Sequence, residues 1–263
     1  MDTDLLKKII IIASFRCSGT HLTIDSLINN SSNISTKLLV IDQLSKKHGS
    51  NIPLTKFLKK LESATKRKQY IIFKTHQPDS TYPLAAESRS FLENVLANAK
   101  KVYVVRDGRD VMVSLWYYLQ TIKSEKGNSF TDILNRYASV WQVHIDHWLQ
   151  KDVYLLKFED WHKEYEKTLN RLLDFIELPS PQKIKNMVGS FQADLRYDNR
   201  LPSILQRILR KTPWKGKRLT TVEQRAGKIG EWENHFSSED KTVFKHLAGE
   251  MLIKLGYEED NDW

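Results

Sequence analysis

The stretch that decides the fold is residues 9–22, which read IIIIASFRCSGTHL. It begins with Ile9–Ala13, a continuous and mostly β-branched apolar run typical of a parallel strand buried on both faces. A turn of small residues follows, and a helix is expected from about Thr20. Because a helix start carries free N–H groups and partial positive charge, this order predicts a phosphate-binding loop. The Ser18 and Thr20 hydroxyls would be further donors to a phosphate.

Short apolar runs recur along the chain and alternate with helical patterns. Further strands are expected at Leu38–Ile41, Tyr70–Phe73, Val102–Val105 and Val153–Leu156. Helices are expected at Leu54–Lys66, Ala85–Ala99, Asp110–Thr121, Phe130–Gln150, Trp161–Ile176 and Ser238–Leu255. The alternation predicts an α/β fold: a central, mainly parallel sheet flanked by helices, with a P-loop-like phosphate-binding topology.

Length and composition favour one domain over residues 1–263. A chain of 263 residues can bury one large core, and no linker rich in Pro, Gly and Ser divides it. Residues 199–219 are irregular, basic and Pro-containing. We interpret them as a mobile lid or as a disordered segment.

The charge balance points to an anionic partner, since 41 Lys and Arg outnumber 32 Asp and Glu and leave a net charge of +9. The basic residues are spread along the chain, which argues against nucleic acid. Ile9–Ala13 is too short to span a bilayer, so no membrane partner is expected. Cys17 is the only cysteine, which excludes an intrachain disulfide and favours the cytoplasm.

Two further stretches carry side chains suited to chemistry on a phosphate-like group. Lys74 and His76 stand at alternate positions where a predicted strand ends, so they share one face, and a neutral His accepts protons at pH 7. Arg106 ends another predicted strand, and Ser114 lies early in the next helix. A guanidinium and a hydroxyl from two elements can converge on one phosphate. Arg109 either joins them or pairs with Asp107 or Asp110.

The chemistry of other enzyme classes is not matched. The loop lacks the Gly-Lys-Ser/Thr end of a Walker A motif, which argues against a P-loop-type nucleotide kinase. No His/Cys/Asp/Glu cluster has zinc spacing, so no metal is expected, and the Gly-x-Ser-x-Gly elbow of Ser hydrolases is missing.

Taken together, four places in the chain resemble the elements with which sulfotransferases grip 3′-phosphoadenosine 5′-phosphosulfate, PAPS. These are Ser14–Leu22, Lys74–His76, Arg106–Ser114 and Arg225–Phe236. The resemblance implies that His76 is the general base, with Lys74 and Arg16 on the transferring sulfuryl group. Its implied cofactor-binding positions are Arg16, Cys17, Ser18, Gly19, Thr20, His21, Arg106, Ser114, Phe158, Arg225, Ala226 and Gly227.

Within that set, the resemblance divides the phosphates. Ser18, Gly19 and Thr20 would hold the 5′-phosphate. The 3′-phosphate would fall to Arg106, Ser114, Arg225 and Gly227. Phe158 would pack on adenine, whereas Trp232 and Phe236 are expected to pack in the core.

The chain departs from the family pattern at the loop. The family lysine falls on Cys17 and the family tryptophan on Leu22, and a later lysine falls on Ala226. A cation that stabilises the leaving group is thus missing from its usual position, and Arg16 is the expected replacement. Cys17 is interpreted as incidental and not as a nucleophile.

The resulting hypothesis is a sulfotransferase that moves a sulfuryl group from PAPS to a hydroxyl or amine of a small-molecule acceptor and releases PAP. A nonenzymatic protein that binds PAP or PAPS is the alternative, and Cys17 is its best argument. The sequence leaves open the acceptor and the oligomeric state.

Overall fold

The computed structural model describes residues 3–45, 52–65, 70–78, 84–120, 125–188 and 227–263. The expected lid at 199–219 lies outside these residues, as do Arg225 and Ala226.

A five-stranded sheet with the order β2-β3-β1-β4-β5 organises the fold, and every pair of neighbours is parallel. Its strands are β1 (Ile9–Ser14), β2 (Ile34–Val40), β3 (Tyr70–Thr75), β4 (Lys100–Val105) and β5 (Tyr154–Lys157). Each corresponds to a predicted strand, and the α/β class with a parallel sheet is confirmed.

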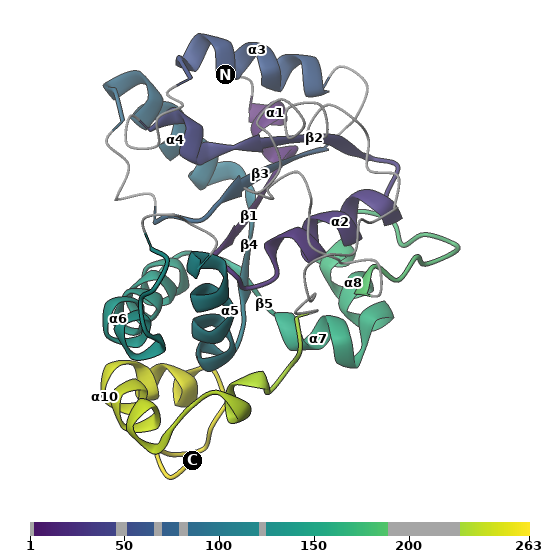
Figure 1. Cartoon of the computed structure of the whole chain (residues 1–263). Coiled ribbons are helices and arrows are strands. Elements are labelled where there is room, and N and C mark those ends of the chain that lie inside the picture. Colours follow the sequence, from purple (N-terminus) through teal and green to yellow (C-terminus); the bar gives the residue numbers. More distant parts are fainter. Residues whose placement is uncertain (1–2, 46–51, 66–69, 79–83, 121–124, 189–226) are drawn as a thin grey trace. The chain divides into compact units, whose positions relative to one another are not determined.

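Helices precede, connect and follow the strands. They are α1 (Thr3–Lys7), α2 (Thr20–Asn30), α3 (Leu54–Thr65), α4 (Ala86–Asn98), α5 (Gly108–Gln120), α6 (Phe130–Leu149), α7 (Phe158–Lys163), α8 (Tyr165–Phe175) and α10 (Ser238–Lys254), with 3₁₀ turns η1 (Ile41–Leu44) and η6 (Glu231–Asn234). The crossover through α2 runs opposite to those through α3 and α4, and right-handed crossovers therefore place α2 on one face and α3 and α4 on the other (Figure 1).

Burial of β1 follows from this two-sided cover. Ile9–Ala13 is completely or almost completely buried, because β3 and β4 flank the strand and helices cover the sheet. The strand is therefore a rigid base for the loop that leaves it.

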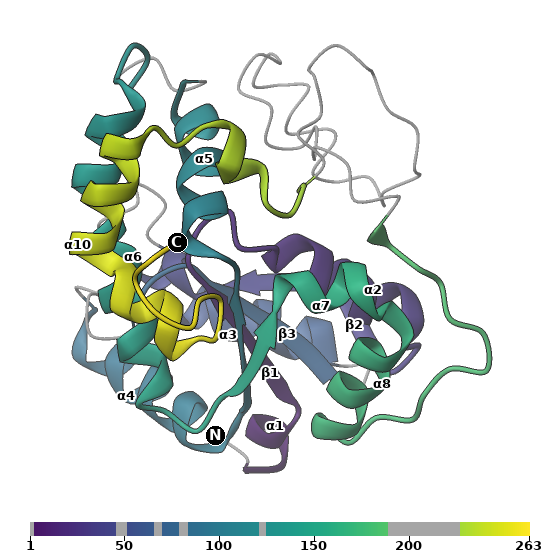
Figure 2. The ribbon, with the colours of Figure 1, turned by 90° about the horizontal axis from the view of Figure 1, so that it is seen from below.

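The expected single helix at Trp161–Ile176 is wrong, since the chain forms α7 and α8 with a break at Glu164. Glu164 has φ −147° and ψ 57°, outside helical values. The break lets α7 follow β5 while α8 packs on α2, and Figure 2 shows the three helices together. The Trp161 indole donates to Thr23 Oγ1 at 3.1 Å, and the Tyr165 hydroxyl donates to Ser26 Oγ at 2.9 Å. Because the apolar pattern continues through the break, the sequence did not reveal it.

Contacts divide the chain into two compact units. The first, Met1–Arg106 with Trp141–Asn186, contains the whole sheet. The second, Asp107–Val140 with Met187–Trp263, contains α5, η6 and α10. Its core includes Phe236, whose ring lies 5.2 Å from Phe130 and 5.9 Å from Phe244. The prediction of one domain over 1–263 stays a prediction.

Candidate active site

The candidate site of the first unit lies at the carboxyl edge of the sheet. Ala13 pairs with Thr75 and Ser14 with Val104, so β1, β3 and β4 end side by side. The chain leaves β1 toward β2 and leaves β4 toward β5, in opposite directions along the sheet. Ligands of open parallel sheets bind where the connections diverge in this way.

The loop from β1 to α2 has the backbone of an anion site. Cys17 and Gly19 both have positive φ, 65° and 93°. Gly19 is the N-cap of α2, and glycine has no side chain that could accept hydrogen bonds from the first N–H groups of the helix. Ser18 is 1% exposed, and its hydroxyl has no hydrogen-bond partner among the described residues. A buried hydroxyl without a partner can donate a hydrogen bond to an oxygen atom of a bound ligand.

Arg106 and Phe158 pack against this loop from β4 and α7. Arg106 is 4% exposed, donates from Nη1 to the Cys17 carbonyl at 3.2 Å and stacks 4.8 Å above the Phe158 ring. A Cβ on Gly19 would lie 2.3 Å from Phe158 Cδ2, so only glycine fits there. The structure thus brings together Arg106, Phe158 and the loop.

His76 follows β3, and its imidazole is held by the main chain of β1. Its Nδ1 lies 3.1 Å from the Ser14 carbonyl, which can only accept, so Nδ1 carries the hydrogen and Nε2 carries the lone pair. Burial, and after it the Lys74 ammonium, holds the pKa of His76 well below its ordinary value of 6.5. The imidazole is therefore neutral at pH 7.

Two residues that the sequence did not single out hold the main chain at His76. Asp42 accepts from the Thr75 hydroxyl at 2.8 Å and from the His76 N–H at 3.4 Å. His144 Nε2 donates to the His76 carbonyl at 3.2 Å, while its Nδ1 lies 2.8 Å from the Tyr103 hydroxyl. Burial lowers the pKa of His144 to about 4 and keeps it neutral. The available signal for Asp42 was its position directly after a strand that adjoins β3.

The cations at this edge differ in how they are held. Lys74 is 8% exposed, and its Nζ lies 2.8 Å from His21 Nε2. Arg16 is exposed.

Burial raises the pKa of the Cys17 thiol to about 11, although Arg106 and Arg16 oppose the shift. Cys17 is therefore a protonated thiol at pH 7, which agrees with the interpretation that it is not a nucleophile.

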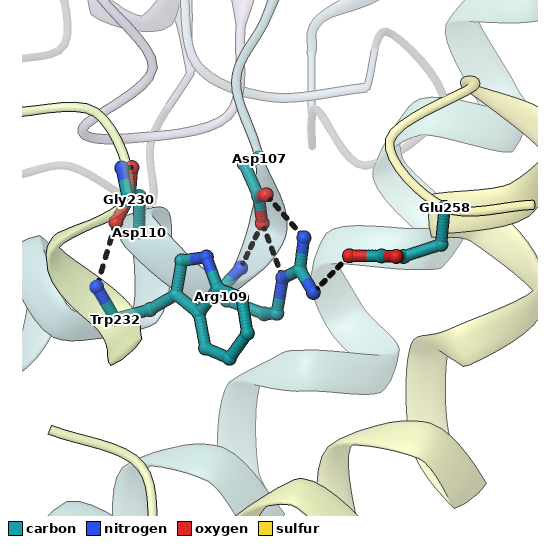
Figure 3. Close-up of polar contacts among 6 residues, drawn as sticks. All are labelled: Asp107, Arg109, Asp110, Gly230, Trp232 and Glu258. Atoms are coloured by element: carbon teal, nitrogen blue, oxygen red, sulfur yellow. Dashed lines mark hydrogen bonds and ion pairs between the residues drawn. The ribbon is translucent and has the colours of Figure 1, made fainter. Parts of the chain in front are cut away.

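Ser114 and Gly227 belong to the second unit, where Arg109 also lies. Arg109 pairs with Asp107 through Nε at 3.0 Å and Nη2 at 2.7 Å and forms a further ion pair with Glu258 (Figure 3). Its guanidinium lies 3.9 Å from the Trp232 ring centroid and 4.4 Å from that of Trp263. Of the two roles left open by the sequence, the structure shows the pairing with Asp107.

Asp110 ties the C-terminal motif to the start of α5. Its carboxylate accepts from the Gly230 N–H at 2.9 Å and from the Trp232 N–H at 3.0 Å (Figure 3). Trp232 and Phe236 are 9% and 8% exposed, which confirms that they pack in the core.

A loop that joins a central parallel strand to a helix start, at the point where the connections diverge, is typical of α/β proteins that bind phosphorylated nucleotides. The comparison with known families is more specific: the sulfotransferase domain matches residues 7–256. The chain belongs to the sulfotransferase family.

Individual relatives and structures agree with this assignment. The chain is 27% identical over 177 residues to sulfotransferase 1E1 of Mus musculus, covering 63% of this chain and 56% of the relative. It is 27% identical over 200 residues to cytosolic sulfotransferase 3 of Arabidopsis thaliana, covering 69% and 59%. The matches thus span less than two thirds of either relative. The crystal structure of mouse sulfotransferase SULT7A1 complexed with PAP has the same fold, with a TM-score of 0.57, 16% identity and coverage of 96% and 86%.

No helix among the described residues is long and apolar enough to cross a membrane. In the same part of the chain, no three His, Cys, Asp or Glu side chains form a group that could hold a metal ion.

Proposed function

We propose that this protein transfers the sulfuryl group of PAPS to a hydroxyl or amine of a small-molecule acceptor and releases PAP. The observation that carries the proposal is the pairing of a neutral His76, fixed through Nδ1, with a loop that carries the orphaned Ser18 hydroxyl on the same sheet edge. A base and an anion site are the two parts that sulfuryl transfer from a nucleotide needs.

The buried Ser18 hydroxyl, without a partner among the described residues, and the buried Arg106 guanidinium support the choice of a ligand that carries phosphate groups, as PAPS does. In this proposal Ser18, Gly19 and Thr20 hold the 5′-phosphosulfate through the start of α2. Arg106, Ser114, Arg225 and Gly227 hold the 3′-phosphate, and Phe158 packs near adenine. The PAP complex of the mouse sulfotransferase supports the choice of nucleotide. No resident metal is part of the proposal.

The proposed mechanism is a direct in-line transfer. As the acceptor oxygen or nitrogen attacks sulfur, His76 Nε2 takes its proton. The bond between acceptor and sulfur forms while the bond from sulfur to the bridging phosphate oxygen breaks, and PAP leaves. Lys74 and Arg16 stabilise the negative charge that grows on the leaving oxygen, and positioned cations of this kind commonly supply much of the rate.

The first prediction concerns the nucleotide. PAP should bind about ten- to a hundredfold more tightly than AMP, because loss of a charge-assisted contact costs roughly 1.5–3 kcal/mol. Isothermal titration calorimetry of both nucleotides measures this ratio. Equal affinities for PAP and AMP would show that the proposed residues do not bind the 3′-phosphate. Tight PAP binding without transfer from PAPS to any of a broad panel of phenols, alcohols and amines would instead favour a nonenzymatic binding protein.

Three features of the proposal rest on the sequence alone: one domain, a cytoplasmic location, and the lack of nucleic-acid or membrane partners. Family membership sets aside the nucleotide kinase. The panel of acceptors includes phenols, steroids and amines.

A further inference from the structure

The contact between Lys74 and His21 is a feature that the proposed mechanism does not use. Lys74 is the penultimate residue of β3, and His21 is the second residue of α2, directly after the phosphate loop. The Lys74 Nζ lies 2.8 Å from His21 Nε2, which is hydrogen-bond distance, and the lysine side chain is almost fully buried.

The donors and acceptors of the two groups fix the state of His21. An ammonium has three hydrogens to donate and no lone pair, so Nε2 must be the acceptor and the hydrogen of the neutral imidazole must be on Nδ1. A histidine in this form is neutral, and its Nε2 accepts a hydrogen bond from the Lys74 ammonium. It therefore adds no charge of its own and restricts where the charge of Lys74 lies.

The position of this charge matters because the loop lacks a lysine at Cys17. Arg16 is exposed and so has freedom to move, whereas Lys74 is buried and bound. The ammonium acts on its surroundings already, since it is the largest charged cause of the low pKa of His76. Of Arg16 and Lys74, the two cations proposed to act on the leaving oxygen, Lys74 is thus the one whose place the fold defines.

We propose that His21 is a positioning residue that holds the Lys74 ammonium beside the start of α2, where it stabilises charge on the leaving oxygen. This inference rests on the proposed sulfuryl transfer. In it the His21 side chain serves Lys74 and not the nucleotide, whose phosphate meets the backbone N–H groups of the loop.

A matched pair of substitutions tests the role. His21→Leu removes the acceptor, and His21→Gln keeps an acceptor oxygen on a side chain of similar reach. We expect His21→Leu to lower kcat about ten- to a hundredfold, because a misplaced catalytic cation loses much of its effect, and to leave the Kd of PAP within about twofold. His21→Gln should recover most of the lost kcat. Equal kcat for His21→Leu and wild type, or equal losses in both variants, would overturn the proposal.

A double-mutant cycle separates positioning from a general packing defect. If His21 acts through Lys74, His21→Leu should have little further effect in a Lys74→Met background. Independent, additive losses would mean that His21 has another task. Thermal unfolding of each variant shows whether it is folded.

A measurement without nucleotide separates this inference from the proposed function. In ¹⁵N-histidine-labelled protein, long-range ¹H–¹⁵N NMR should show His21 with its hydrogen on Nδ1, and Lys74→Met should change that tautomer. The His21→Gln variant assigns the signal. If His21 carries its hydrogen on Nε2 in the wild type, the inference fails whether or not the protein binds PAP. If the tautomer is as expected but PAP does not bind, the proposed function fails and the contact stands.

Discussion

In the proposed mechanism, the position of the His76 imidazole is set by neighbours that do not react. Its Nδ1 is committed to Ser14, while Asp42 and His144 hold its main chain. The imidazole orientation therefore does not depend on the bound ligands. Positioning of this kind is worth more to a transfer reaction than a stronger base would be.

At this scale we predict that His76→Ala lowers turnover by about 10²–10⁴, the usual contribution of a positioned base, and leaves PAP affinity nearly unchanged. Sulfate transfer from PAPS to an acceptor and calorimetry with PAP measure the two effects. His246→Ala is the control, because His246 is an exposed histidine on α10. Undiminished turnover in His76→Ala would remove His76 from the mechanism.

The low pKa of His76 gives a second prediction at the residue scale. A base works in its neutral form, so activity falls on the acid side only as pH drops through the pKa of the base. Since burial and Lys74 lower that pKa well below 6.5, kcat/KM should stay level from pH 8 to 6.5 and decline only at more acid pH. A rate profile with an acid midpoint at or above 6.5 would contradict the described environment.

Between elements, the β1–α2 loop approaches α7 closely at Gly19. Gly19 has φ 93°, and its missing Cβ leaves room for the Phe158 ring. We predict that Gly19→Ala lowers PAP affinity more than tenfold, because either the loop or Phe158 must shift, and destabilises the fold by about 1–3 kcal/mol. Calorimetry and urea unfolding measure these changes.

Gly127→Ala is the matched control for this substitution. Gly127 also has a positive φ, 100°, but a Cβ there would meet nothing within 4 Å. It should therefore show the backbone strain alone, about 1 kcal/mol, with PAP affinity unchanged. If both variants bind PAP like the wild type, the contact with Phe158 does not shape the nucleotide site.

The sequence predicted the strands well because each is a short apolar run bounded by polar residues, as at Tyr70–Phe73. It also placed Lys74, His76 and Arg106 at strand ends, and adjacency at one edge follows from a parallel sheet. It did not show the break at Glu164, since a local backbone change leaves the apolar period intact. Asp42 and His144 were missed because their role depends on contacts across elements, which spacing along the chain does not encode.

For the whole molecule, buried neutral histidines tie stability to pH. The pKa of His144 is about 4 in the folded protein and is ordinarily 6.5. The unfolded chain therefore takes up protons first as pH falls, so stability present above 6.5 is lost progressively down to about 4. His76 shifts in the same direction.

We predict that His144 alone accounts for about 2 kcal/mol of the stability lost between pH 7 and pH 5. In His144→Gln this part should disappear, so the free energy of unfolding should depend less on pH. Urea unfolding of both proteins at the two pH values measures the difference. The same pH dependence in variant and wild type would show that His144 is not buried in its neutral form.

Because β1 lies between two neighbouring strands, hydrogen exchange of its amides should respond to ligand binding. Its amides are hydrogen-bonded within a sheet whose neighbouring strands lie on both sides, so they exchange with deuterium only when the surrounding sheet opens. A ligand that binds the folded state alone adds its full stabilisation to the cost of that opening, about 2.7 kcal/mol at a hundredfold excess over Kd. The hydrogen–deuterium exchange rates of the Ile9–Ile12 amides, measured by mass spectrometry, should therefore fall when any ligand occupies the loop at the end of the strand.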